Sequence, residues 1–246
     1  RMNATIETMR SHRSIRKFTD KTIPDKIIEI ILTSAQCAAT SSFVQAYTII
    51  RVDDQQNRQA IAKICGSQPW VIDAPVFFVF LADLNRLEAA CRKHGKEMAD
   101  GYMEQFIVAT VDTALVGQNT LLAAESMGLG GVFIGAIRNN PKKICDMLNL
   151  PEKTYPVFGM CLGYPDDQPP VKPRLPLECI FMKETYQTDG GDAVLNAYDE
   201  TTRRYYLSRD SNLKDETWSC QMAGFMSQVI RPHMKAVIDS KGFCIR

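Results

Sequence analysis

An unbroken apolar run, Pro75-Val-Phe-Phe-Val-Phe-Leu81, is the feature that most constrains how this chain can fold. The run is too short for a typical helix, and its Val and Phe residues favour a strand. Because it contains no polar residue, neither face of that strand can lie in water. The run therefore predicts a central strand in a sheet that is covered on both faces.

Apolar periodicity predicts three further strands and a series of helices. The strands are expected over residues 44–52, 132–137 and 157–163. Helices are expected over residues 24–35, 55–64, 103–127, 141–148, 192–207 and 217–240. The helix over 103–127 is mostly apolar and should be buried nearly all round, whereas the charged segment 86–101 is typical of a solvated excursion. This alternation of strands and helices indicates a mixed α/β domain.

Charge and cysteine usage exclude several classes of protein. The chain has 29 basic and 28 acidic residues, so its net charge of +1 provides no field that favours nucleic acid or an anionic membrane. The stretch with the fewest charges, Thr113–Ala124, is too short to span a bilayer. The polar N-terminus lacks the apolar core of a signal peptide. Because the eight cysteines form no CxxC motif, we expect reduced thiols and a cytoplasmic protein.

Two basic segments are candidates for binding an anion. His12-Arg13-Ser14-Ile15-Arg16 brings two guanidinium groups close to a hydroxyl and an imidazole, and Lys172-Pro173-Arg174 holds two cations in a proline-stiffened loop. Arginine matches phosphate oxygens in a bidentate fashion. The alternatives are a solvated helix end for the first segment and a solvated loop for the second. If the two segments meet, they would suit a dianionic phosphate.

Other signatures of catalysis are missing from the sequence. The glycines of Gly128–Gly135 follow a helix and lead into a strand, so they do not form a dinucleotide-binding loop. Gly135 is typical either of a close approach to a ligand or of a bulge. The sequence contains no GxSxG motif and no metal-ligand spacing, and His94 and His233 are interpreted as surface residues. These features favour an enzyme whose cofactor carries the chemistry, without a catalytic side chain or a metal.

The order of the motifs resembles that of the FMN-dependent nitroreductase family, in its NADPH-preferring group of oxygen-insensitive nitroreductases and NADPH–flavin oxidoreductases. The resemblance covers nearly the whole chain and is carried by residues 12–18, 40–45, 112–114, 118–119, 123–135, 138–140, 158–163, 172–176, 205–209 and 215–218. It implies an α+β fold with a mostly antiparallel central sheet flanked by helices. It also implies a single domain over residues 1–246, in which residues 177–246 form a helical arm that packs on the partner subunit and over the flavin.

The resemblance also assigns roles to residues. It implies a homodimer with FMN sites at the interface, in which Thr40, Ser41 and Ser42 reach the flavin of the other subunit. The remaining FMN-binding residues would be His12, Arg13, Ser14, Ile15, Arg16, Gln68, Pro69, Trp70, Phe133, Ile134, Gly135, Ala136, Lys172 and Arg174. Arg209 and Lys214 would meet the 2′-phosphate of NADPH.

The implied activity is ping-pong hydride transfer from NADPH through flavin N5 to nitroaromatics or quinones. One alternative is an NADPH–FMN oxidoreductase that supplies free reduced flavin, and another is a non-catalytic flavin-binding module. Three positions depart from the family pattern: the serine run is one threonine and two serines, Ala136 replaces a usual glycine, and Lys214 replaces an arginine. Because lysine lacks the bidentate fork, the NADPH preference is less strongly implied than the FMN site.

Overall fold

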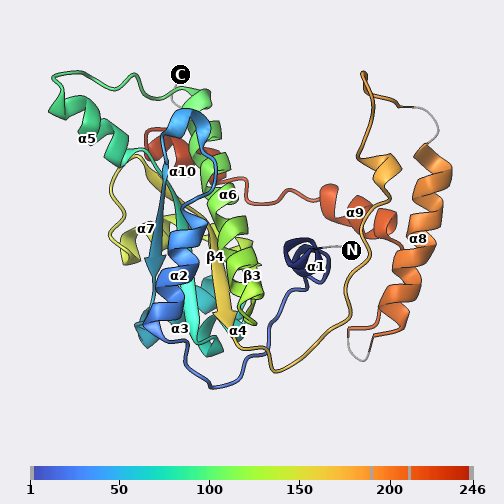
Figure 1. Cartoon of the computed structure of the whole chain (residues 1–246). Helices are drawn as coiled ribbons and strands as arrows, with labels where there is room; N and C mark the ends of the chain where they lie inside the picture. The colour runs from blue at the N-terminus through green and yellow to red at the C-terminus, as the bar shows by residue number, and fades with distance from the viewer. Residues whose placement is uncertain (1–2, 189–190, 210–211, 244–246) are drawn as a thin grey trace. The chain divides into compact units, whose positions relative to one another are not determined.

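The structure, a computed structural model, describes residues 3–188, 191–209 and 212–243 (Figure 1). The chain divides into two compact units, of which the first comprises residues 1–169 and 231–246 and the second residues 170–230.

The first unit contains a four-stranded sheet. Its strands are β1 (Tyr47–Arg51), β2 (Val76–Asp83), β3 (Gly130–Ile134) and β4 (Thr154–Gly163), in the order β1-β2-β4-β3. Every neighbouring pair is antiparallel, which confirms the α+β fold. The mixed α/β arrangement expected from alternation alone is therefore wrong, because side-chain periodicity locates a strand but does not set its direction.

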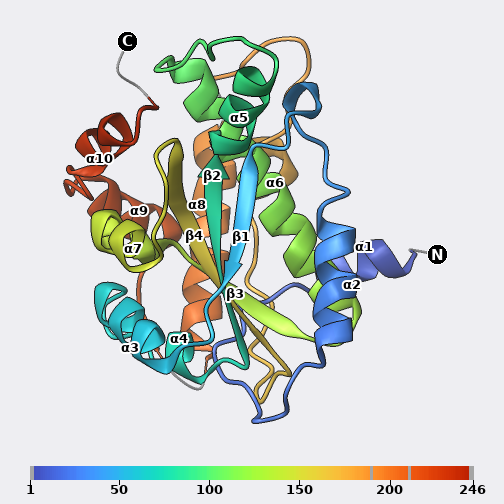
Figure 2. The same ribbon diagram turned by 90° about the vertical axis from the view of Figure 1, so that its left-hand side faces the viewer.

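The central strand β2 is covered on both faces, as the apolar run predicts, and all eight of its residues are buried. Phe77 packs in the core on one face, while Phe78 and Phe80 pack in the core on the other. Figure 2 shows helices on both sides of the sheet. The first face is covered by α3 (Gln55–Ile64), α4 (Trp70–Asp73) and α7 (Pro141–Met147), and the second by α2 (Asp25–Ala35) and α6 (Met103–Ser126).

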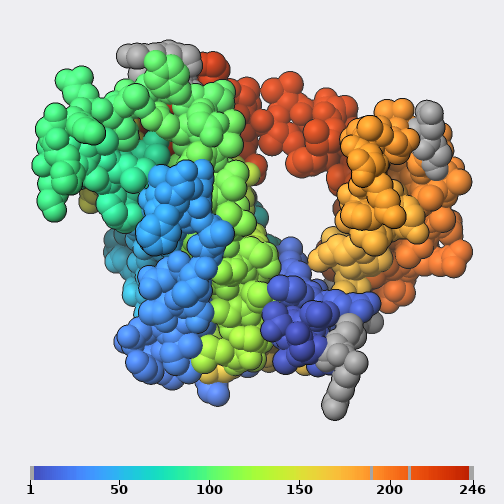
Figure 3. Space-filling view, turned by 45° about the horizontal axis from the view of Figure 1, so that its top comes forward, coloured from blue at the N-terminus to red at the C-terminus, as the bar shows by residue number. Residues whose placement is uncertain are grey.

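Helix α6 is not buried all round, which corrects the expectation from its composition. Met103, Ile107, Val111 and Leu115 are 43–54% exposed and follow one another at four-residue spacing. Figure 3 shows α6 as a green band on the surface beside the blue atoms of α2. Among the described helices, α6 alone is long and apolar enough to cross a membrane, but its other side belongs to the core of the first unit.

Two other segments also differ from the sequence prediction. The charged segment 86–101, expected as a solvated excursion with no helix assigned, begins with a helix, α5 (Asn85–Lys93), whose charged residues lie on its outer face. The single helix expected over 217–240 is two helices, α9 (Trp218–Met226) and α10 (Met234–Ser240). Between them Arg231 has a φ of 52° and is followed by Pro232, and both features are incompatible with a continuous helix. Helix α1 (Ala4–Arg10) was not predicted.

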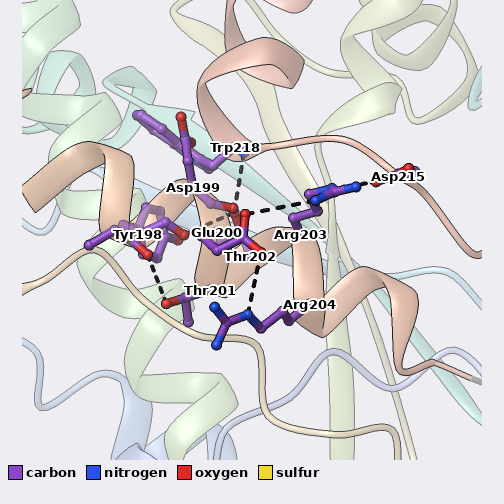
Figure 4. Close-up of polar contacts among 10 residues, drawn as sticks. Tyr198, Asp199, Glu200, Thr201, Thr202, Arg203, Arg204, Asp215 and Trp218 are labelled. Atoms are coloured by element: carbon purple, nitrogen blue, oxygen red, sulfur yellow. Dashed lines mark hydrogen bonds and ion pairs between the residues drawn. The ribbon is translucent and has the colours of Figure 1, made fainter.

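The second unit holds a short helix, η3 (Leu177–Cys179), together with α8 (Gly191–Leu207) and α9. The start of α9 is fixed to α8 by polar contacts, several of which are drawn in Figure 4. The Trp218 amide donates to Thr202 Oγ1 at 3.2 Å, and the Ser219 amide donates to Asp199 Oδ1 at 2.8 Å. Because the first amides of a helix have no carbonyl partner inside it, these bonds define where α9 begins.

Two glycine substitutions test the packing of the sheet. A β-carbon at Gly159 on β4 would lie 2.7 Å from the ring of Phe77, whereas one at Gly224 on α9 meets nothing within 4 Å. We expect Gly159→Ala to lower the free energy of unfolding by about 1–3 kcal/mol. Gly224→Ala should raise it by about 0.5–1 kcal/mol. Urea titration measures both, and a Gly159→Ala midpoint equal to that of the wild type would contradict this packing.

Candidate functional site

The basic segment 12–16 lies against the edge of the sheet. The Ile15 amide donates to the Gly131 carbonyl of β3 at 3.0 Å, and the Ile15 side chain is buried. A β-carbon at Gly130 would lie 2.5 Å from the Ile15 side chain, so this glycine makes the close approach possible. Ile15 therefore anchors the segment to β3. Because the Ile15 side chain is buried, this residue can offer a ligand only its backbone.

The polar residues of this segment are held by different partners. His12 Nδ1 lies 2.5 Å from Glu125 Oε1 at the end of α6. Arg13 donates to the Ser11 carbonyl at 3.1 Å and to the Pro169 carbonyl at 3.3 Å. Within the described chain, no carboxylate forms an ion pair with Arg13 or Arg16. Two guanidinium groups close in sequence and without carboxylate partners are suited to a multiply charged anion.

A second expected segment, Gln68–Trp70, lies beside the first. The guanidinium carbon of Arg16 is 5.6 Å from the centre of the Trp70 ring, within the range of a cation–π contact. The Trp70 indole N–H donates to Gln68 Oε1 at 3.0 Å. The structure thus brings Arg16, Trp70 and Gln68 together, although some 50 residues separate the two segments in sequence.

The third expected segment, residues 133–136, connects the end of β3 to the short helix η2 (Gly135–Asn139). Phe133 is 37% exposed and packs edge-on against Phe158, whereas Ile134 is buried and can offer a ligand only its backbone. The Asn139 amide group of η2 donates to the Ile64 carbonyl at the end of α3 at 3.0 Å. The chain continues from Ile64 towards Gln68, so this bond places the third segment near the second.

Arg138 in η2 and two residues that bond to η2, Arg231 and His233, were not predicted as site residues. Arg231 Nε donates to Asn139 Oδ1 at 2.9 Å, and His233 Nε2 donates to the Arg138 carbonyl at 2.9 Å. Burial, and then the positive charge of Arg231, lower the pKa of Arg138. His233 is therefore a half-buried residue that holds the turn, which corrects its interpretation as a surface residue. In the sequence, only the order Arg231-Pro232-His233 indicates this role, because the proline marks a point where the chain turns.

The serine segment Thr40–Ser42 lies at a different place in the first unit. Its Ser41 amide donates to Asp112 Oδ1 on α6 at 3.0 Å. Asp112 and Glu125 are 13 residues apart on one helix, which corresponds to about 20 Å along its axis. One chain therefore does not bring Thr40–Ser42 together with His12. Ser41 and Ser42 instead line a cavity of about 820 Å³ with residues of α5 and of the first turns of α6.

In the second unit, expected site residues gather around two tyrosines. Lys172 Nζ lies 5.4 Å from the centre of the Tyr206 ring, and the Arg209 guanidinium lies 5.8 Å from the same ring and 5.9 Å from that of Tyr205. Arg174 donates to the Lys172 carbonyl at 3.3 Å. Within the described residues, none of these three cations forms an ion pair with a carboxylate. Like charges around one ring repel one another, so the cluster is suited to an anion.

Lys214 is exposed in the loop between α8 and α9. Its neighbour Asp215 is paired with Arg203 Nε, and this ion pair attaches the loop to α8. The Arg203 side chain lowers the pKa of the Asp215 carboxyl. The loop is therefore attached next to Lys214, whose own side chain stays in solvent.

Two family models match the chain. The model described as the nitroreductase family matches residues 9–164, and the model described as the nitroreductase family, C-terminal domain, matches residues 172–246. The chain therefore belongs to the nitroreductase family.

Curated relatives and solved structures agree with this assignment. The chain is 41% identical over 246 residues to FMN reductase (NADPH) from Bacillus subtilis, covering 98% of this chain and 99% of the relative. It is also 41% identical over 245 residues to the oxygen-insensitive NADPH nitroreductase of Salmonella typhimurium, with full coverage of both. The solved NADPH:FMN oxidoreductase from Vibrio harveyi complexed with NAD⁺ is 38% identical, with a TM-score of 0.91 over 99% of this chain and 100% of that one.

The cysteines provide a test of burial beside the site. Burial raises the pKa of the Cys65 thiol to about 12, despite the opposing charge of Arg231, and it also raises that of Cys161. Because the thiolate is the reactive form, we expect the exposed Cys37 and Cys220 to react with Ellman's reagent at pH 8 while Cys65 and Cys161 react only on unfolding. Rapid labelling of Cys65, mapped by mass spectrometry, would contradict the structure.

The same shift predicts how stability depends on pH. The Cys65 thiol ionises in the unfolded chain near its ordinary value of 9.0, but in the folded chain only near 12. Its contribution to stability is therefore complete below pH 9 and is lost as the pH rises towards 12. In urea titrations over this range, Cys65→Ala should make the fall in the free energy of unfolding less steep.

Proposed function

We propose that this protein is an FMN-dependent NADPH oxidoreductase. The observation that carries the proposal is the meeting of Arg16, Trp70 and Gln68 beside the edge strand β3. This arrangement combines a cation, an aromatic surface and an amide, which are the groups that a phosphorylated flavin requires. The names of the two relatives that are 41% identical, an FMN reductase (NADPH) and an NADPH nitroreductase, support the same activity.

The donor set of the first unit fits FMN. The cofactor carries a dianionic phosphate, and Arg13 and Arg16 supply guanidinium groups that no carboxylate in the described chain neutralises. At the end of β3, Phe133 is 37% exposed and offers an aromatic surface to a flat ligand. The residues present are therefore compatible with the group that the family implies.

FMN, when bound, supplies the hydride transfer between NADPH and the acceptor. The protein's part is to bind and orient. His12, Arg13, Ser14 and Arg16 would hold the ribityl phosphate, with Lys172 and Arg174 as further cations. Gln68, with Pro69 and Trp70, would bind the polar edge of the ring, while Phe133 and the backbone of residues 134–136 would line its other side. No side chain is required as an acid or a base.

Arg209 and Lys214 would select NADPH through its 2′-phosphate. Arg209 is supported by the rings of Tyr205 and Tyr206, which limit its motion and keep its guanidinium available for a phosphate. Lys214 offers only a point charge, so Arg209 should provide most of the discrimination between NADPH and NADH.

We further propose that the protein is a homodimer with its FMN sites at the interface. The exposed apolar stripe on α6 is typical of a buried subunit contact. The separation of Thr40–Ser42 from His12 along α6 supports a site that takes these hydroxyl groups from the other subunit. Of residues 177–246, those up to 230 would form an arm that packs on the partner and over the flavin, and exposed Leu177, Ile180 and Phe181 support such packing. Residues from 231 onward belong to the first unit instead.

The acceptors would be flat, electron-poor small molecules such as nitroaromatics and quinones, or a second, free flavin. Matched assays with nitrofurazone, a quinone and added FMN would distinguish these acceptors. We place the protein in the cytoplasm, because the seven cysteines in the described part of the chain are all free thiols.

Anaerobic bleaching of the yellow flavin band tests the activity. We expect NADPH to bleach the purified protein rapidly and NADH much more slowly. Arg209→Ala should lower the kcat/KM for NADPH by about 10–100-fold and leave that for NADH nearly unchanged, because a charge-assisted bond to phosphate is lost. Arg204→Ala, in the last turn of α8 but paired with Glu200, is the matched control and should change neither value.

Each of the other outcomes of this experiment has its own meaning. A yellow protein that is bleached equally by both nucleotides would remove the role of Arg209 but keep the enzyme. A yellow protein that neither nucleotide bleaches would indicate a flavin-binding module without activity. A protein that takes up no FMN would overturn the proposal.

The α6 stripe makes the dimer testable. Val111→Glu places a charge in the middle of the exposed apolar face, so we expect the dimer to dissociate and FMN binding to weaken with it. Ala89→Glu adds the same charge to an exposed position of α5 and serves as the control. Light scattering after size exclusion gives the oligomeric state, and a wild-type monomer that still bound FMN would contradict a shared site.

A further inference from the structure

We propose that Asp112 is a positioning residue for the flavin site, which it serves by fixing the loop Thr40–Ala46 to α6. This inference rests on the proposed function, because the loop carries the hydroxyl groups expected to reach FMN. Asp112 itself would touch neither cofactor nor substrate. It lies within α6 and is fully buried.

Both carboxylate oxygens of Asp112 accept hydrogen bonds from the backbone of the loop. Oδ1 accepts a hydrogen bond from the Ser41 amide at 3.0 Å, and Oδ2 accepts one from the Ala46 amide at 3.1 Å. The two amides lie at the two ends of the loop. The buried Asp112 side chain therefore bridges two loop residues that lie five positions apart in sequence.

The loop requires such a bridge because its backbone is strained. Ser42, Phe43 and Gln45 have φ values of 47°, 59° and 53°, in a region that side chains other than glycine rarely adopt. Each such residue costs of the order of 1 kcal/mol and persists only where the surroundings hold it. Strain of this kind is typical of segments that present groups to a ligand.

The outer side of the loop is available to a ligand or a partner. Ser41 and Ser42 are exposed and line the cavity of about 820 Å³, and Phe43 is 81% exposed. The inner side is tied to Asp112, so the buried carboxylate and the exposed hydroxyl groups lie on opposite sides of one short turn. A change at Asp112 would therefore be transmitted to the two serines.

The same helix carries the stripe that we assign to the subunit interface. Val111 precedes Asp112 and is half exposed, and Leu115 follows one turn later on the exposed face. At 3.6 residues per turn, Asp112 lies about 100° around the helix from Val111. Subunit pairing and the position of the serine loop would thus be set by neighbouring faces of α6. Without Asp112, the dimer could still form, but Ser41 and Ser42 would lose their fixed position at the flavin.

The test is Asp112→Asn in the full-length protein. An amide of the same size has only one oxygen, so it can accept from one of the two loop amides and directs N–H donors at the other. We expect FMN to bind at least about tenfold more weakly to the apo-protein, measured by quenching of flavin fluorescence. The visible circular dichroism of the bound flavin should also change, while light scattering still shows a dimer.

Thr120→Val is the matched control. Thr120 is equally buried in α6, and its hydroxyl donates to the Val116 carbonyl within the helix at 2.8 Å, remote from the loop. We expect this variant to lose stability in urea but to bind FMN within twofold of the wild type with an unchanged dichroism spectrum. A general loss of helix stability therefore cannot imitate the effect of Asp112→Asn.

A second pair of variants keeps the test decisive if Asp112→Asn does not fold. Ser41→Pro removes the amide N–H that donates to Asp112 Oδ1, while Asp112 itself stays in place. Ser41 is the first residue of a short helix, a position where proline is tolerated. Ser41→Ala removes only the hydroxyl. We expect Ser41→Pro to weaken FMN binding clearly more than Ser41→Ala does.

The outcomes separate this inference from the proposed function. A wild-type protein that binds no FMN would contradict the proposed function. If the wild type binds FMN and Asp112→Asn binds it within twofold with an unchanged spectrum, only the positioning role of Asp112 fails. Equal effects of Ser41→Pro and Ser41→Ala would overturn that role as well, because the hydroxyl alone would then explain the loss.

Discussion

Helix α6 is buried in the core on one side and exposed to solvent on the other. The arrangement of the rest of the first unit depends on this helix. Its inner side packs against the sheet that β2 organises, while its outer side leaves an apolar stripe in water. Two acidic residues follow Glu104 in this helix, and each holds a different segment. Glu125 pairs with His12, and Asp112 binds the serine loop. Because the helix is rigid, the distance between these segments is fixed by its rise per residue.

The charges of the two units show a common arrangement. Several basic side chains on the surface have an acidic partner, as Arg92 has Glu88 and Arg203 has Asp215. Two of the expected site cations, one in each unit, instead rest on aromatic rings: Arg16 on Trp70 in the first unit and Arg209 on Tyr206 in the second. A ring orients a cation without neutralising it, so the charge stays available for an anionic ligand.

The return of the chain after the second unit gives the site a further support. Arg231 and His233 bond to η2, the short helix that follows β3. The parts of the chain before and after the second unit thereby belong to the same, first unit. The position of η2 depends on them, since Arg138 is buried there beside a second guanidinium and loses part of its hydration.

The sequence by itself determined the elements whose pattern is strong and local. The apolar run of β2, helix α3 and the start of α7 at Pro141 lie where periodicity and proline place them, and the motif order identified the family. Only the tertiary structure decided what depends on contacts between distant residues. It decided the antiparallel order of the strands, the exposed stripe of α6, the break before α10, and the contact between Arg16 and Trp70. Periodicity records how often a side chain faces the core, but not which neighbour covers it, so burial against a subunit and burial within the fold look the same in sequence.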